Sequence, residues 1–118
     1  MSRIVKIGSQ RFTQVSCLDE PGAGGACHEY AVLTNDENRD SCAYVHFQNG
    51  PVKENGVNGC HQEDLLAIVI DRLESFQAGE YACRENAIAL TKIEEAMMWL
   101  NKRTSDRQQR GVEGTSKK

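Results

Sequence analysis

The chain has 118 residues, a length that fits one domain and leaves little room for a second independently folded one. Hydrophobic residues make up 39% and charged residues 26%, as in an ordinary globule, and no stretch approaches the ~20 apolar residues needed to cross a bilayer. The net charge of -3 weighs against general binding to a nucleic-acid backbone. We therefore expect a cytosolic protein with neither a membrane nor a nucleic acid as partner.

The cysteines are odd in number and widely spaced, without a C-x-x-C pair, which is typical of free thiols in a reducing cytosol. Some stand beside a histidine, as in Cys27-His28 and Cys60-His61, and Cys42 lies near His46. None of these groupings has the tight spacing of a zinc knuckle, so we expect no metal and no cofactor.

Four stretches rich in β-branched or aromatic residues predict strands at 4–7, 11–15, 29–33 and 43–47. Gly8-Ser9 is short enough for a hairpin turn, and the glycine-rich segment 21–25 predicts a flexible loop. Residues 1–59 should therefore form a small antiparallel sheet of three to four strands. The repeated glycine and asparagine of 55–59 predict an irregular connector after it.

From His61 the apolar residues recur at helical spacing, and Gln77-Ala78-Gly79 interrupts them. A second helix should begin near Glu80 and run to about Arg110, with Gly111 as its C-cap. The short break predicts an antiparallel αα-hairpin over 60–112, followed by a mobile polar tail at 113–118. The expected fold is thus α+β, one domain over 1–118, with self-association through the helices.

Three arginines, Arg103, Arg107 and Arg110, fall on one face of the predicted second helix. Guanidinium groups match phosphate oxygens bidentately and stack on flat rings, so the array suits a phosphorylated ligand that bears a base. The alternative is an ordinary helix end, with arginines that complement the dipole and form surface pairs with Asp106. Spacing alone favours this alternative.

Other positions carry weaker signals. Phe76 at the hairpin bend could stack on a base, and Asn86 could read a base or ribose edge, although a core role for such an aromatic is more common. The sequence has no G-x-S-x-G, Walker or G-x-G-x-x-G motif that would favour an enzyme.

A series of short motifs resembles the phage anti-Thoeris sponge family, whose relatives include the anti-CBASS cyclic-nucleotide sponges. In the helical half these motifs are FQAG (76–79), CREN (83–86), AL (89–90), EA (95–96), WL (99–100), RT (103–104), DR (106–107) and RGVEGT (110–115). HFQNGP (46–51) and GVNG (56–59) precede them, so the likeness extends over about 44–115.

The resemblance implies a phage protein that acts in the cytosol of an infected bacterium and holds immune signals without cleaving them. Those signals are glycocyclic ADP-ribose (gcADPR) and cyclic di- or trinucleotides. It also implies dimers that assemble into hexamers. By position, the implied ligand contacts are made by six residues: Phe76, Arg84, Asn86, Arg103, Thr104 and Arg107.

Helix geometry adds a constraint of its own. Asn86 and Arg103 are 17 residues apart on one predicted helix, or about 25 Å at 1.5 Å per residue. A pocket that uses both must lie between two chains. Two alternatives to a sponge stay open: a cyclic-nucleotide hydrolase, and a small nucleic-acid-binding regulator.

Overall fold

A computed structural model describes residues 2–8 and 11–118. It divides the chain into two compact units, Met1–Cys60 and His61–Lys118. The boundary lies one residue beyond the end expected for the β half. That both units form a single domain stays a prediction.

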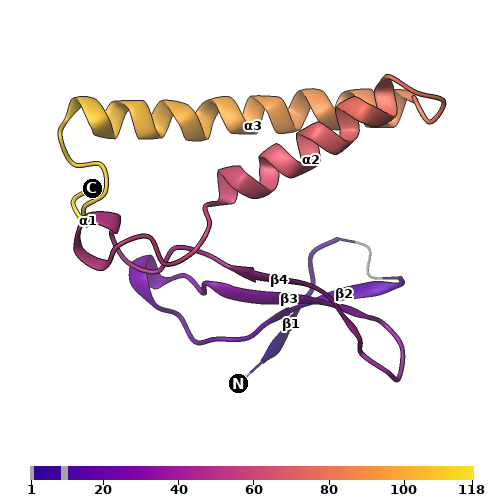
Figure 1. Ribbon diagram of the computed structural model, residues 1–118, viewed down its shortest axis with the longest axis horizontal. Coiled ribbons are helices and arrows are strands. Elements are labelled where there is room, and N and C mark those ends of the chain that lie inside the picture. Colours follow the sequence, from indigo (N-terminus) through magenta and orange to yellow (C-terminus); the bar gives the residue numbers. More distant parts are fainter. Residues whose placement is uncertain (1, 9–10) are drawn as a thin grey trace. The chain divides into compact units, whose positions relative to one another are not determined.

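The first unit contains a four-stranded antiparallel sheet in the order β1-β2-β3-β4 (Figure 1). Its strands are β1 (Arg3–Val5), β2 (Thr13–Cys17), β3 (Glu29–Thr34) and β4 (Ser41–His46). The predicted sheet is confirmed, although β2 begins two residues later than expected. Part of the predicted Gly8-Ser9 turn lies outside the described residues.

The short segment between β2 and β3 carries one 3-10 turn, η1 (Ala23–Gly25), where a flexible loop was expected. At the base of this segment, Leu18 N–H donates to the Glu29 carbonyl at 2.9 Å, which continues the β2–β3 pairing past the end of β2. The segment 18–28 is therefore a closed loop with a fixed base.

After β4 the chain forms a short helix, α1 (Val52–Asn55), which ends where the irregular connector predicted at 55–59 begins. Pro51 supplies the N-cap position with its fixed φ of -65°, which favours a helical turn directly after it. Gly59 then allows a close approach, because a Cβ there would lie 2.5 Å from the Phe47 carbonyl. This approach brings Cys60 beside Phe47 in an isolated parallel bridge.

Side-chain amides brace the same connector. Gln48 Nε2 donates to the Gly56 carbonyl at 2.8 Å, and its Oε1 accepts the Asn58 N–H at 2.9 Å. Asn58 in turn bonds both the N–H and the carbonyl of Asn49, each at 2.8 Å. Asn58, one of the asparagines that predicted an irregular connector, therefore helps to hold it together with Gln48.

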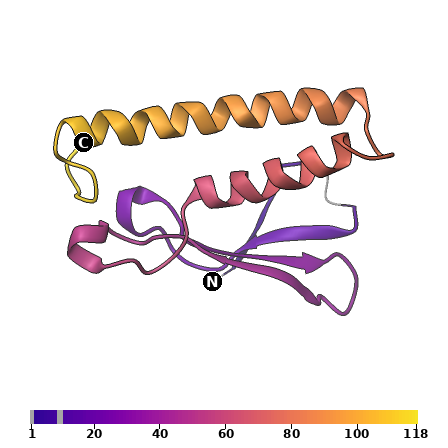
Figure 2. The same cartoon turned by 45° about the horizontal axis from the view of Figure 1, so that its top comes forward.

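The second unit is a helical hairpin of α2 (Gln62–Gln77) and α3 (Arg84–Gln109), which fold back on one another (Figure 2). The predicted hairpin is confirmed. α3 begins four residues later than expected because the Cys83 side chain accepts the Asn86 N–H at 3.4 Å and caps the helix there. At the other end Gly111 has a φ of 73°, as expected of a residue just beyond a helix C-terminus.

The chain encloses little apolar core of its own. Among the described residues, Cys17 and Ala31 are the buried hydrophobic ones, and no apolar residue of α2 or α3 is buried. Neither unit therefore closes a sizeable apolar core by itself. Large side chains of the hairpin stay exposed, among them Ile68 at 64%, Met98 at 69% and Trp99 at 65%.

Candidate functional site

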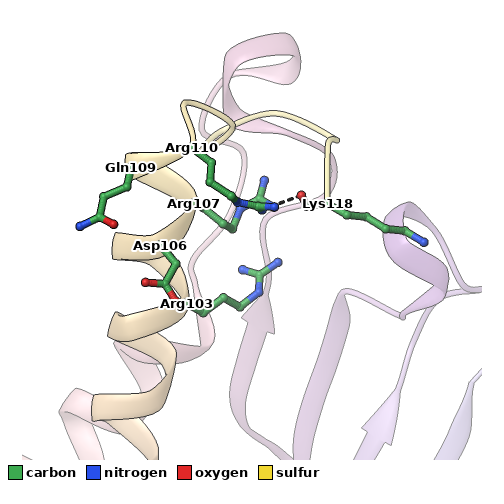
Figure 3. Close-up of a pocket in the computed structure, with 6 residues that line it drawn as sticks. All are labelled: Arg103, Asp106, Arg107, Gln109, Arg110 and Lys118. Carbon is green, nitrogen blue, oxygen red and sulfur yellow. Dashed lines mark hydrogen bonds between the residues drawn. The ribbon is translucent and has the colours of Figure 1, made fainter.

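The C-terminal end of α3 forms a polar hollow of about 740 Å³. Figure 3 shows the guanidinium groups of Arg103, Arg107 and Arg110 lying to one side of the helix. The spacing of these residues therefore places them on one face, as expected from the sequence. The residues that line the hollow are Arg103, Asp106, Arg107, Gln109, Arg110 and Lys118.

Arg107 is buried, with 7% of its surface exposed. Its Nε donates to Glu113 Oε1 at 3.0 Å, and its Nη1 donates to the Lys117 carbonyl at 2.7 Å. Its Nη2 donates to the carbonyls of Val112 at 2.9 Å and Thr115 at 3.0 Å. Arg107 is therefore not the surface arginine of an ordinary helix end, because the chain beyond Gly111 folds back and wraps its side chain.

The partner carboxylate, Glu113, is held in its ionised form. Partial burial raises the pKa of Glu113. Hydrogen bonds from Arg107 and the Gly114 N–H, together with the charges of Arg107 and Arg103, lower this pKa by more than burial raises it. The net effect is a pKa below the usual range. Arg107 and Glu113 therefore form an ion pair that closes the turn after α3.

Arg103 differs from Arg107 although it lies one helical turn away. It is exposed, and no described residue hydrogen-bonds to its guanidinium or forms an ion pair with it. Asp106, the expected surface partner of the arginines, instead pairs with Lys102 at 2.9 Å. Arg110 Nη2 donates to the main-chain oxygen of Lys118 at 2.5 Å. Among the three arginines, Arg103 thus keeps its whole donor fork for a ligand.

Thr104 follows Arg103 and is half-buried. Its hydroxyl donates to the Leu100 carbonyl at 3.3 Å, within the helix. The hydroxyl oxygen retains acceptor capacity, and its donor would have to turn away from the helix to reach a ligand.

The hairpin bend holds the other predicted contacts. The Phe76 ring meets the Tyr81 ring edge to face with centroids 6.2 Å apart, and the Arg72 guanidinium lies 5.0 Å from the Phe76 centroid. Asn86 is half-buried, and its side-chain amide bonds to no other residue of the described chain. Arg84 is exposed and equally unengaged in that part of the chain. The bend thus offers an aromatic face, an amide and a cation.

The structure does not bring the six predicted residues together within one chain. Asn86 and Arg103 both lie in α3, an uninterrupted helix, so about 25 Å separates them. Phe76, Arg84 and Asn86 form one group at the bend, whereas Arg103, Thr104 and Arg107 form another at the far end. Each group is half of the predicted constellation.

The spacing of the arginines does not reveal the acceptors of Arg107, above all Glu113. The glycine just beyond the helix is the sequence feature that indicates Glu113 as a partner of Arg107. A positive φ at Gly111 turns the chain back toward the last helical turn. An acidic residue two positions beyond such a glycine lies within reach of an arginine in that turn.

Potential metal ligands also gather in the first unit, although the sequence predicted no metal site. Within the described chain the five cysteines are free thiols. The described residues contain one group of three potential ligands, Cys17, Asp19 and Cys27, with ligating atoms within 4.8 Å of one another. It involves none of the histidines beside which cysteines stand in the sequence.

None of the helices in the described part of the chain combines the length and the apolar composition that a membrane crossing requires.

The sequence of the chain is similar to those of known proteins. Residues 43–105 match the family described as "Acb2/Tad1, hairpin domain", a segment that includes the bend residues, Arg103 and Thr104. Over 76 residues the chain is 64% identical to "Thoeris anti-defense 1" of Bacillus phage SBSphiJ7. That alignment covers 64% of this chain and 54% of the relative, so the chain spans about half the length of the curated protein. Because the family match extends over more than half of the sequence, the chain belongs to the Acb2/Tad1 hairpin-domain family.

Proposed function

We propose that this protein is a phage-encoded sponge that counters Thoeris defence by binding a cyclic nucleotide signal and releasing it unchanged. The ligand class is gcADPR or a cyclic di- or trinucleotide, and the site of action is the cytosol of the infected bacterium. The 64% identity to a Thoeris anti-defence protein supports the role in defence evasion.

The observation that carries the proposal is the unengaged guanidinium of Arg103 beside the hollow. Guanidinium forks hold phosphate oxygens bidentately. Glu113 balances the charge of Arg107, but Arg103, Arg110 and Lys118 still outnumber the single acidic residue of the lining, Asp106. The potential there is therefore positive although the whole chain carries -3. A ligand with several phosphates and flat bases matches this end of α3.

The base-reading half of the site comes from a second chain in this proposal. A ligand of nucleotide size cannot contact Asn86 and Arg103 of one helix, because about 25 Å separates them. Two antiparallel copies of the hairpin would place the bend of each chain against the arginine end of the other and create two equal sites. The exposed apolar side chains of α2 and α3, such as Ile68 and Met98, supply the surface for that contact.

Recovery of the ligand separates a sponge from an enzyme. The purified protein is incubated with gcADPR or a cyclic dinucleotide, filtered, denatured by heat, and the released compound is analysed by chromatography. A sponge depletes the free ligand in proportion to protein and returns it intact, whereas a hydrolase returns a linear product. Linear product, or no depletion of any candidate ligand, would contradict the proposal.

Substitution of Arg103 tests the site itself. Arg103→Ala removes the unengaged donor fork, and loss of a charged hydrogen bond corresponds to about 10- to 100-fold weaker binding by titration calorimetry. Lys92→Ala removes an exposed cation from the middle of the same helix and is the matched control. Equal affinities of the two variants would show that charge in general, and not this site, attracts the ligand.

A complementation experiment tests the sharing of sites between chains. Asn86→Ala and Arg103→Ala chains are co-expressed with different tags, and the mixed dimer is isolated by two affinity steps. In such a dimer one site carries both substitutions and the other carries neither, so about half of the wild-type capacity returns. If the mixed dimer bound as little ligand as either single-variant dimer, Asn86 and Arg103 would either belong to a site within one chain or not belong to a ligand site at all.

A further inference from the structure

The end of strand β2 and the loop after it gather two thiols around one carboxylate. Cys17 is the last residue of β2 and is fully buried, at 0% exposure, whereas Cys27 lies ten positions later and is half-buried. Both thiols donate to the Asp19 main-chain oxygen, at 3.5 Å from Cys17 and 3.4 Å from Cys27. The loop therefore brings together two sulfur atoms that are distant in sequence.

Asp19 is held in place by the backbone around it. Its Oδ1 accepts the N–H groups of His28 and Glu29, each at 3.2 Å, and its Oδ2 accepts the His28 N–H at 3.0 Å. Cys17 Sγ lies 3.8 Å from Oδ1. Main-chain donors of this kind orient a carboxylate without removing all of its lone pairs, as the outer shell of a metal site does.

From this cluster we propose that Cys17, Asp19 and Cys27 bind a soft divalent metal ion of the zinc type, with one coordination position open to water. Their ligating atoms lie within 4.8 Å of one another. Tetrahedral zinc with bonds of about 2.0–2.3 Å sets its ligand atoms roughly 3.3–3.8 Å apart, so the side chains need to close by only about an ångström.

Charge and softness both favour this ion. Two thiolates and a carboxylate carry three negative charges, and a divalent cation leaves one of them. The Arg3 guanidinium, with its Nη2 4.0 Å from Cys27 Sγ, supplies the balancing positive charge. Thiolates select zinc-like ions over magnesium or calcium, which prefer sites made of oxygen ligands alone.

The site is independent of the nucleotide-binding proposal. Residues 17–27 precede the segment 43–105 that matches the family, and they belong to the first compact unit. The metal would tie the end of β2 to the start of β3 across the loop. It would therefore stabilise the sheet.

Cobalt(II) titration of the full chain under reducing conditions tests the proposal, because tetrahedral thiolate coordination gives charge-transfer and strong visible bands. We expect saturation at one ion per chain and displacement by zinc. Cys27→Ser removes one of the two thiolates and should reduce the charge-transfer band and weaken binding at least about tenfold, while Cys42→Ser, at an exposed cysteine, should leave both unchanged. Failure of the wild-type chain to bind, or equal spectra for the two variants, would overturn the site.

A second measurement needs no substitution and so does not depend on the folding of a variant. The wild-type chain is treated with an alkylating reagent with and without equimolar zinc, and each cysteine is followed by peptide mass spectrometry. Zinc should slow the alkylation of Cys27 at least about tenfold and leave Cys42 and Cys83 unaffected. Equal rates at Cys27 with and without zinc would also overturn the proposal.

Discussion

The buried guanidinium of Arg107 gives the sharpest prediction about the arginine end. Arg107→Ala removes four hydrogen bonds to the segment 112–117 and leaves Glu113 without its partner. Breaking a buried ion pair costs about 3–5 kcal/mol. The Glu113 side chain is 35% exposed and can regain water, so we expect a smaller loss, about 2–3 kcal/mol, from the stability of this turn.

Hydrogen–deuterium exchange measures that loss where it occurs. The Val112 N–H, which donates to the Arg107 carbonyl at 3.0 Å, and the Thr115 N–H should exchange about 30- to 150-fold faster in Arg107→Ala. Arg103→Ala is the matched control, since that exposed side chain holds nothing in place and should leave exchange within about twofold. Unchanged protection in Arg107→Ala would refute the structural role assigned to this residue.

Two further predictions concern the turn after α3 and the connector after β4. Because the pKa of Glu113 is lowered in the folded state, its contribution to stability is fully present above its unfolded pKa of about 4.3 and is lost as pH falls through the folded pKa. The difference in unfolding free energy between wild type and Glu113→Gln should therefore be constant from pH 7 to about pH 5 and should shrink below pH 5. If the difference stayed constant down to pH 2, the ion pair could not be its source. Gly59→Ala forces a Cβ to within 2.5 Å of the Phe47 carbonyl and should lower the free energy of unfolding, measured by chemical denaturation, by about 1–3 kcal/mol. Gly79→Ala is the control, because its nearest contact would be at 3.6 Å and the change should be nearly neutral. Equal denaturation midpoints of the two variants would contradict the close approach at Gly59.

The elements of the fold were predictable because their signals are local. Stretches rich in β-branched or aromatic residues predicted the sheet, and the helical period predicted the hairpin, each to within a few residues. The boundaries that moved did so for reasons beyond those patterns. α3 starts at Arg84 because a cysteine acts as N-cap, and α1 forms directly after Pro51, whose fixed φ favours a helical turn.

The site was less predictable because its parts are brought together by the chain beyond a helix end. Spacing placed Arg103 and Arg107 on one face, but it did not distinguish an unengaged guanidinium from one enclosed by the tail. That difference depends on Gly111, which turns the segment 112–117 back over Arg107 alone. The thiol pair at Cys17 and Cys27 was equally hidden, since a loop closure and not a sequence motif sets its geometry.

The engagement of Arg107 also constrains how a phosphate can approach. A phosphate that bonds Arg107 must first displace Glu113 and the carbonyls, which weakens its binding by the same 30- to 150-fold that the turn contributes. A phosphate held by Arg103 alone meets no such cost. Hydrogen–deuterium exchange measured with saturating ligand decides which arginine binds the phosphate. Faster exchange of the Val112 and Thr115 N–H groups requires that Arg107 has changed partners. Unchanged exchange leaves Arg103 as the phosphate contact and Arg107 as a residue that shapes the wall of the hollow beside it.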